Sequence, residues 1–135
     1  MFNRAVAWMG LVACSGLQAQ EISIEAWWAA TDANGVQRVY VECGTNYIDP
    51  REIVVRRGVP VEIAIRAGPD VADDELIFSP PGLTEIRSPV GRQPTTVRFT
   101  PQLHGNAALR CSARGARESG VTQARRQGLL HVVPP

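Results

Sequence analysis

Cysteine and histidine offer the widest chemistry of any residue types in this 135-residue chain, and there are five of them: Cys14, Cys43, Cys111, His104 and His131. Thiolates and imidazoles are nucleophiles and ligands for transition metals. No two histidines stand at metal-binding spacing, and no serine forms a recognisable array with histidine and aspartate. The chain has no lysine, which excludes a Schiff-base or phosphate-loop lysine. We therefore expect no enzymatic activity.

Charged residues are the second group that could do chemistry. The run Asp73-Asp74-Glu75 could bind a hard cation, but neighbouring residues on a strand point to opposite faces, so we expect no closed calcium site. The chain has 14 basic and 13 acidic residues, so its net charge is too small to attract a polyanion over a long distance. The arginines between 110 and 126 have no interleaved aromatic residues. We therefore expect no nucleic-acid partner.

The first nineteen residues have the pattern of an export signal. A basic start (1–4) precedes an apolar run (5–13), and Leu17-Gln18-Ala19 ends in the small residue that signal peptidases require. The apolar run is too short to span a bilayer as a helix. Residues 11–13 with Cys14 also match a lipobox, so a lipid anchor at Cys14 is the alternative. The stretch before Cys14 is short for such a signal, and we favour a periplasmic or secreted protein cut after Ala19.

Two cysteines, Cys43 and Cys111, remain after this cut. An oxidising compartment favours disulfides, and an even count permits a single bridge. The alternative is a buried free thiol at each position.

Short alternating runs rich in β-branched residues and bounded by Gly and Pro begin at Gly35. This pattern is typical of an all-β sandwich. We predict about seven strands, at 36–42, 53–57, 61–66, 75–78, 95–99, 107–111 and 129–133, and no helix. Residues 20–34, with the tandem Trp27-Trp28, are predicted as an N-terminal leader that lies across the domain or is a partly ordered linker. A single domain then covers 35–135.

Alternation within these strands predicts which side chains face the core. The predicted core residues are Ile53, Val55, Val61, Ile63, Ile65, Leu76, Phe78, Val97 and Phe99. His104 is predicted at the surface, at the end of the sandwich opposite Cys111. His131 is predicted as a half-exposed strand residue.

Several of these stretches together resemble the cupredoxin superfamily, and especially its periplasmic single-domain members. They are GVQRVYV (35–41), YIDP (47–50), IVV (53–55), GVPVEI (58–63), VRFTP (97–101), Gly105 followed six residues later by Cys111, and GLLHVV (128–133). The resemblance covers about Gly35 to Pro135 and extends in fold to the copper domains of terminal oxidases and nitrous oxide reductase. It implies a Greek-key β-sandwich.

The resemblance also implies positions for the ligands of a blue-copper site, which are a thiolate, two imidazoles and a weak thioether. The thiolate position is Cys111. The first histidine position holds Asp74, and the second histidine and methionine positions fall on Val121 and Arg126. No histidine lies between Cys111 and Gly128, and both methionines lie within the export signal. We expect a degenerate site with no resident metal cofactor.

The same resemblance places the acidic run near the arginines that follow Cys111. Asp74 and Arg126 are predicted to form an ion pair, because guanidinium binds carboxylate bidentately. The alternative is a set of solvated surface charges. Cys43 follows the first strand, which in the family runs close to the metal end, so a Cys43–Cys111 disulfide is expected there.

Two functions follow as hypotheses. The first is an exported cupredoxin-fold protein that has lost most copper ligands and serves as a non-catalytic binding or structural module, near a periplasmic redox or metal-handling system, with a protein partner that the sequence does not identify. The alternative is a copper-binding electron-transfer or copper-delivery protein that uses Cys111.

Overall fold

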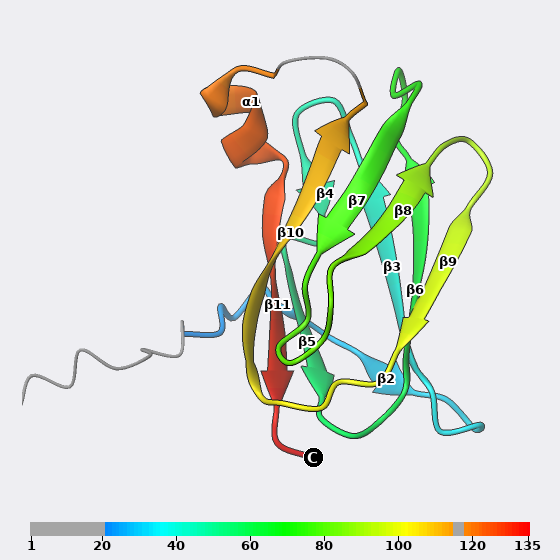
Figure 1. Ribbon diagram of the computed structural model, residues 1–135, viewed down its shortest axis with the longest axis vertical. Coiled ribbons are helices and arrows are strands. Elements are labelled where there is room, and N and C mark those ends of the chain that lie inside the picture. The colour runs from blue at the N-terminus through cyan, green and yellow to red at the C-terminus, as the bar shows by residue number, and fades with distance from the viewer. Residues whose placement is uncertain (1–20, 115–117) are drawn as a thin grey trace, which may run out of the picture.

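Two β-sheets packed face to face form the protein in the computed structural model, which describes residues 21–114 and 118–135. Figure 1 shows the sandwich with its single described helix at one end and the C-terminus at the other. One sheet contains β1 (Trp27–Trp28), β5 (Glu52–Arg56), β11 (Gln127–Val133), β10 (Gly105–Ala113), β7 (Asp74–Phe78) and β8 (Ile86–Val90), in that spatial order. The other contains β2 (Ala30–Thr31), β3 (Gln37–Cys43), β6 (Val61–Ala67) and β9 (Thr95–Phe99), and β4 (Ile48–Asp49) also pairs with β3.

The strand order requires long connections between the sheets. β5 pairs in parallel with β11, and β3 pairs in parallel with β6, whereas β10 is antiparallel to both β11 and β7. Parallel neighbours need a crossover, and the chain makes these crossovers by passing from one sheet to the other. The predicted Greek-key β-sandwich is confirmed.

All seven predicted strands are present, with ends that differ by at most two residues from the prediction. The sequence pattern missed β8, because this strand contains Pro89. Proline lacks an amide donor and fits a sheet mainly at its edge, and β8 is an edge strand. The two-residue strands β1, β2 and β4 were also not predicted, since segments of that length carry no periodicity.

The expectation of no helix after Gly35 is wrong. A short helix, α1 (Gly120–Arg125), lies between β10 and β11. The Ser119 hydroxyl caps its first turn by accepting a hydrogen bond from the Thr122 N–H at 3.2 Å. An N-terminal serine cap of this kind stabilises a helix too short to show a hydrophobic period.

The N-terminal segment 21–34 joins the two sheets. β1 extends the first sheet by pairing in parallel with β5, and β2 pairs with β3 of the second sheet. Trp27 and Trp28 nevertheless remain 55% and 52% exposed. Residues 1–20 lie outside the described residues, so the predicted signal peptide (1–19) and the alternative anchor at Cys14 stay predictions. No helix in the described part of the chain is long and apolar enough to cross a membrane.

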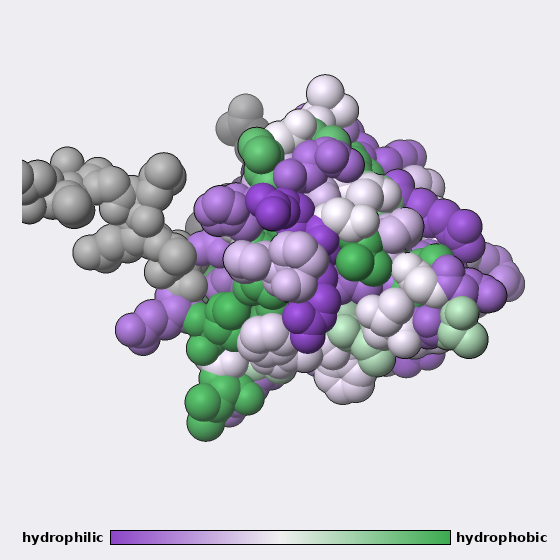
Figure 2. Space-filling view, turned by 90° about the horizontal axis from the view of Figure 1, so that it is seen from below, coloured by the Kyte–Doolittle hydropathy of each residue, from purple (hydrophilic) through white to green (hydrophobic). Residues whose placement is uncertain are grey.

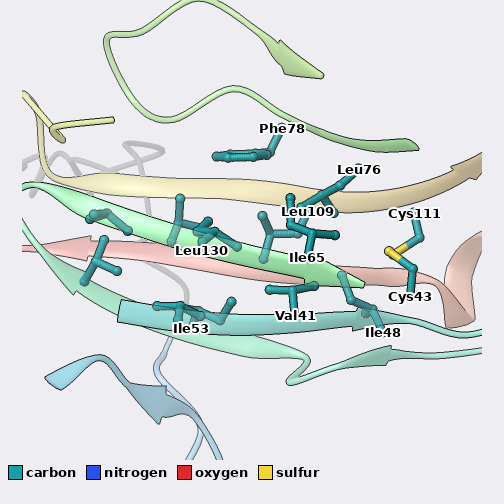
Figure 3. Close-up of a cluster of buried hydrophobic side chains, with 14 of the residues drawn as sticks. Val41, Cys43, Ile48, Ile53, Ile65, Leu76, Phe78, Leu109, Cys111 and Leu130 are labelled. Atoms are coloured by element: carbon teal, nitrogen blue, oxygen red, sulfur yellow. A yellow bond between two sulfur atoms is a disulfide. The ribbon is translucent and has the colours of Figure 1, made fainter. Parts of the chain in front are cut away.

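The core fills the space between the two sheets (Figure 3). Eight of the nine predicted core residues are buried, and Val97 is partly buried against them. Ile53, Ile63 and Ile65 are fully buried. The disulfide sulfurs lie at one end of this cluster and continue it toward the end of the sandwich.

The two histidines differ in how well the sequence predicted them. His104 is exposed just before β10 begins, at the far end of that strand from Cys111, as expected. The expectation that His131 is half-exposed is wrong, since only 1% of it is exposed. Its strand β11 is central, and its ring lies beside Asn106 Oδ1 at 2.9 Å and Glu52 Oε1 at 3.6 Å. Polar groups on neighbouring strands make its burial tolerable.

At Gly128, β11 lies very close to the loop before β5. A Cβ atom at Gly128 would lie 2.5 Å from the Arg51 carbonyl oxygen, and backbone must move to admit it. We predict that Gly128→Ala lowers the free energy of unfolding by about 1–3 kcal/mol, as overpacking does. Chemical denaturation measures this difference.

Gly91→Ala is the matched control, because nothing lies within 4 Å of its added Cβ. Its stability should stay unchanged or rise by up to about 1 kcal/mol through the entropy of the unfolded chain. Equal effects of the two substitutions would contradict the close approach at Gly128.

Candidate functional site at the helical end of the sandwich

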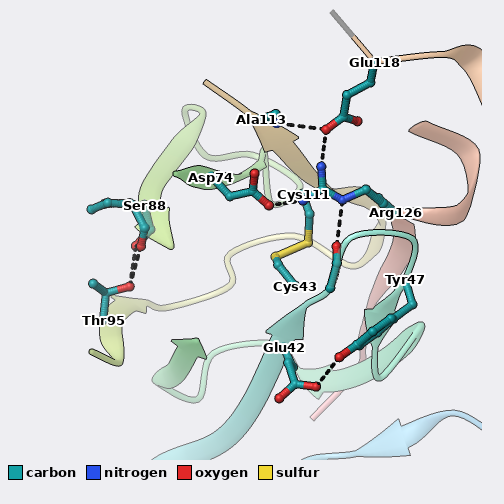
Figure 4. Close-up of a disulfide and its surroundings, with 12 residues drawn as sticks. Glu42, Cys43, Tyr47, Asp74, Ser88, Thr95, Cys111, Ala113, Glu118 and Arg126 are labelled. Atoms are coloured by element: carbon teal, nitrogen blue, oxygen red, sulfur yellow. Dashed lines mark hydrogen bonds and ion pairs between the residues drawn. A yellow bond between two sulfur atoms is a disulfide. The ribbon is translucent and has the colours of Figure 1, made fainter. Parts of the chain in front are cut away.

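Four segments meet at the end of the sandwich where α1 lies. They are the end of β3, the start of β7, the end of β10 and the turn from α1 into β11. Figure 4 shows a disulfide and the Arg126 side chain at this meeting point. The disulfide and Arg126, with the groups that bind them, are called the bridging site below.

The disulfide joins Cys43, the last residue of β3, to Cys111 of β10. It therefore links one sheet to the other. The two Cα atoms are 5.8 Å apart, within the range for a native disulfide, and at most 3% of either residue is exposed. The bridge closes a loop of 68 residues, and a disulfide of this kind stabilises a domain by about 2–4 kcal/mol. The expected disulfide is confirmed.

The guanidinium of Arg126 is buried and binds three acceptors. Its Nε donates to the Gly44 carbonyl oxygen at 2.9 Å, its Nη2 binds Asp74 Oδ2, and its Nη1 binds Glu118 Oε1. Only 3% of the Arg126 side chain is exposed, against 5% for Asp74 and 11% for Glu118. Burial lowers the pKa of Arg126 below its ordinary value. The two carboxylates balance this buried cation.

The local chain positions Arg126 through its backbone as well. Its N–H donates to the Thr122 and Gln123 carbonyls and ends α1, and its carbonyl accepts the Cys111 N–H at 3.0 Å. Glu118 also accepts the N–H of Ala113, the last residue of β10 and the one paired with Asp74, at 3.1 Å. The helix therefore holds both the arginine and one of its carboxylates against β10.

A tyrosine supports the neighbouring loop. Tyr47 donates its hydroxyl to Glu42 Oε2 at 2.7 Å (Figure 4). Its ring occupies the place of a Cβ on Gly44, so that position needs glycine, and its hydroxyl oxygen would lie 2.6 Å from a Cβ on Gly68. The hydrogen bond to the Glu42 carboxylate raises the pKa of Tyr47 above its ordinary value of 10.0, with smaller effects from burial and nearby negative charge.

The structure brings together most of the residues that the sequence singled out. Asp74 contacts Arg126, and Cys111 is bonded to Cys43. Val121 does not join them, since it is 63% exposed on α1. Glu75, next to Asp74, instead lies on the surface side, 2.8 Å from Arg87.

Sequence reasoning missed Glu118 and the Gly44 carbonyl. One signal for Glu118 was present: it is the only acidic residue after Cys111. In a segment otherwise rich in arginine, a lone carboxylate is a natural partner for a buried guanidinium. A backbone carbonyl such as that of Gly44 leaves no sequence signal.

The residues at this end do not fit a blue-copper centre. Such a centre needs a free thiolate, two imidazoles and usually a thioether. Here the Cys111 sulfur is in a disulfide, Asp74 binds a guanidinium, and that guanidinium occupies the end of the sandwich as a cation. Within residues 21–114 and 118–135, no three His, Cys, Asp or Glu side chains are placed to share a metal ion.

Comparison with solved structures gives clear matches, whereas no protein-family model and no curated protein matches the sequence. The metal-binding domain of the Cu(I)-exporting P-type ATPase CopA from Streptococcus pneumoniae superposes with a TM-score of 0.61 and 27% identity, covering 83% of this chain and 99% of that chain. Auracyanin A, a blue copper protein from Chloroflexus aurantiacus, gives 0.52 and 21%, covering 71% and 99%. Reduced auracyanin from Roseiflexus castenholzii gives 0.54 and 14%, covering 78% and 99%.

These matches, together with the strand order, define the class of protein. The chain has the cupredoxin-like fold, as the sequence resemblance implied. At its helical end a disulfide and a buried arginine join the strands.

Arg126 should be the most sensitive charged residue of the bridging site. We predict that Arg126→Met lowers the free energy of unfolding by about 3–5 kcal/mol, because it leaves Asp74 buried without a counter-ion. Replacing both partners, with Asp74→Leu added, should recover a large part of the loss. Chemical denaturation with the disulfide intact measures the unchanged protein, the two single variants and the double variant.

Arg125→Met is the matched control, since Arg125 is the exposed neighbour in sequence. It should change stability by no more than about 0.5 kcal/mol. Additive effects of Asp74→Leu and Arg126→Met would show that the two side chains do not interact.

Tyr47 should titrate above pH 10. A tyrosine whose pKa is raised by folding stabilises the protein below its unfolded pKa, and this contribution is lost as the pH rises through the folded value. Tyrosinate absorbance measures the titration, and Tyr40→Phe leaves Tyr47 as the single tyrosine. Adding Glu42→Gln should lower the midpoint toward 10.0. A midpoint that does not respond to Glu42→Gln contradicts the hydrogen bond.

Proposed function

We propose that this protein is an exported cupredoxin-fold module that has exchanged its copper centre for a structural bridge and acts by binding, without catalysis. One observation carries the proposal. Cys111, the sole retained position of the copper ligands, is consumed by the disulfide to Cys43. The positions of the first histidine and the methionine hold Asp74 and Arg126, which bind each other.

The bridging site can hold together the same loops that copper joins, which supports the proposed exchange of copper for side-chain contacts. In a blue-copper protein the metal joins loops at one end of the sandwich, and its ligand set must be nearly complete. The bridging site joins the corresponding loops by one covalent bond and by the three acceptors of Arg126. The fold can therefore persist without copper. The surface of the domain is then the part that remains available for function.

We infer the location of the protein from the predicted N-terminal signal and from the disulfide, which both favour an oxidising compartment. We place the protein in the periplasm or outside the cell, near a redox or metal-handling system. The similarity to a domain of a copper-exporting ATPase supports a metal-handling neighbour.

That same similarity, at 27% identity, favours a second candidate: a copper-delivery protein that uses Cys111 after the disulfide is reduced. The two candidates differ in what copper does. A delivery protein must bind copper at its free thiolate, whereas a binding module with a structural bridge need not.

A copper titration with a free-thiol count tests the proposal. The purified exported protein is measured first as isolated and then after reduction, by visible absorption and by bound copper per chain. We predict no free thiol and no copper–thiolate band in the protein as isolated. After reduction we predict two thiols and still no intense band, because the imidazoles and the thioether are missing.

One copper bound per chain in either state, with or without a visible band, overturns the proposal and establishes the copper-binding candidate, because Cu(I) bound to a thiolate has no visible band. The matched variant Cys43→Ser frees the Cys111 thiol without a reductant. It should likewise give no intense band, and a band in this variant would show that the disulfide alone suppresses a working site.

A further inference from the structure

A groove of about 510 Å³ lies away from the bridging site, along the exposed face of β3 and β6. Two aromatic side chains line it: Trp27 from β1 and Tyr40 from β3, which are 55% and 70% exposed. Between the strands Ala64 contributes only a methyl group. Seen from below, the surface is mostly hydrophilic, with hydrophobic groups on the left of the view and others near its centre and right (Figure 2).

The charges in the groove leave a negative excess. Glu42 and Arg66 both line it and bind each other at 3.0 Å. Asp49 also lines it, is exposed, and forms no ion pair with any described residue within 4.0 Å. The groove therefore contains one carboxylate that no neighbouring cation balances.

A second cavity next to the groove also has more carboxylates than guanidinium groups. It shares Asp49 and Pro50 with the groove, and adds Glu25 and Glu52 against one cation, Arg51. The Glu52 carboxylate already accepts the Ser23 N–H and lies beside His131. Over the two cavities, four carboxylates face two guanidinium groups.

Exposed aromatic rings beside unbalanced carboxylates are the chemistry that recognises organic cations. The face of a tryptophan or tyrosine ring attracts a guanidinium or ammonium group, and a carboxylate adds a charged hydrogen bond. Grooves lined by aromatic residues also receive extended, proline-containing peptides, which lose little conformational entropy on binding. The groove is open and adjoins the second cavity at Asp49 and Pro50, which suits a peptide better than a single small cation.

We propose that this groove binds an extended peptide segment of a partner protein that carries arginine or lysine. Trp27 and Tyr40 contact the cationic side chains, and Asp49 neutralises their charge. The proposal rests on the proposed function in one respect, because it names the kind of partner that a non-catalytic binding module would have. It uses no residue of the bridging site.

The experiment uses the full exported protein and a short, fluorescently labelled peptide of alternating arginine and proline, with binding followed by anisotropy. We expect saturable binding that weakens as salt rises. Trp27→Ala should weaken it at least about tenfold, as loss of a central aromatic anchor does. Asp49→Asn should weaken it severalfold and flatten the salt dependence.

Trp28→Ala is the matched control, since Trp28 is equally exposed on the same strand but does not line the groove. It should leave the affinity within about twofold, as substitutions outside the contact surface do. A peptide with glutamate in place of arginine should not bind. Circular dichroism verifies that each variant is folded.

Three outcomes overturn the proposal: no binding of the cationic peptide, equal binding of the glutamate peptide, or equal losses for Trp27→Ala and Trp28→Ala. Binding of a neutral oligosaccharide with loss in Trp27→Ala, in the absence of peptide binding, would assign the groove to a sugar instead. None of these results affects the copper titration, so failure of this inference and failure of the proposed function are distinguishable.

Discussion

A buried guanidinium is the constraint on which the helical end of this protein depends. Arginine stays charged and carries five N–H donors in a rigid plane, so its burial requires acceptors in that plane. Arg126 finds them at Gly44, Asp74 and Glu118, which are 82, 52 and 8 residues away in sequence. The loop after β3, the start of β7 and the segment before α1 must therefore all converge on one side chain. Apolar packing alone would not specify that convergence.

The disulfide and the arginine act on different states of the chain. The Cys43–Cys111 bond joins the two sheets covalently and reduces the entropy of the unfolded chain. Arg126 acts in the folded state, where it orients the loop beyond Cys43 and the first residue of β7. Removing either carboxylate or the guanidinium leaves a buried charge, so the network favours one arrangement of the loops over others. In copper-binding members of this fold a metal can perform both tasks; here side chains of the chain itself do so.

Local alternation explains why so much of the fold could be predicted. All seven predicted strands are present, because a side chain that alternates between core and solvent leaves a period of two in the sequence, and because short runs of β-branched residues also favour strands. The prediction failed where the usual preference of a residue type is overridden by its position in the folded protein. Pro89 obscured β8, which tolerates proline only because it is an edge strand. His131 was misjudged because Asn106 and Glu52, which surround it, lie on other segments.

The bridging site was predictable only in part, for a similar reason. Asp74, Cys111 and Arg126 stood out because a family resemblance put them at ligand positions, and no periodicity connects residues so far apart in sequence. Glu118 carried a weak compositional signal, and the Gly44 carbonyl carried none. The helix that holds Arg126 is too short to show an amphipathic pattern, so its position came from the structure alone.

Solvent exchange of the Arg126 Nε–H is the measurement that tests this account most directly. This proton donates to the Gly44 carbonyl in the buried centre of the bridging site. In nitrogen-resolved NMR spectra we expect one arginine Nε–H signal strongly protected from exchange with water, absent from the Arg126→Met variant and retained in Arg125→Met. If every arginine Nε–H exchanges as fast as an exposed guanidinium, Arg126 is not buried among its three acceptors, and the account of this end of the sandwich is wrong.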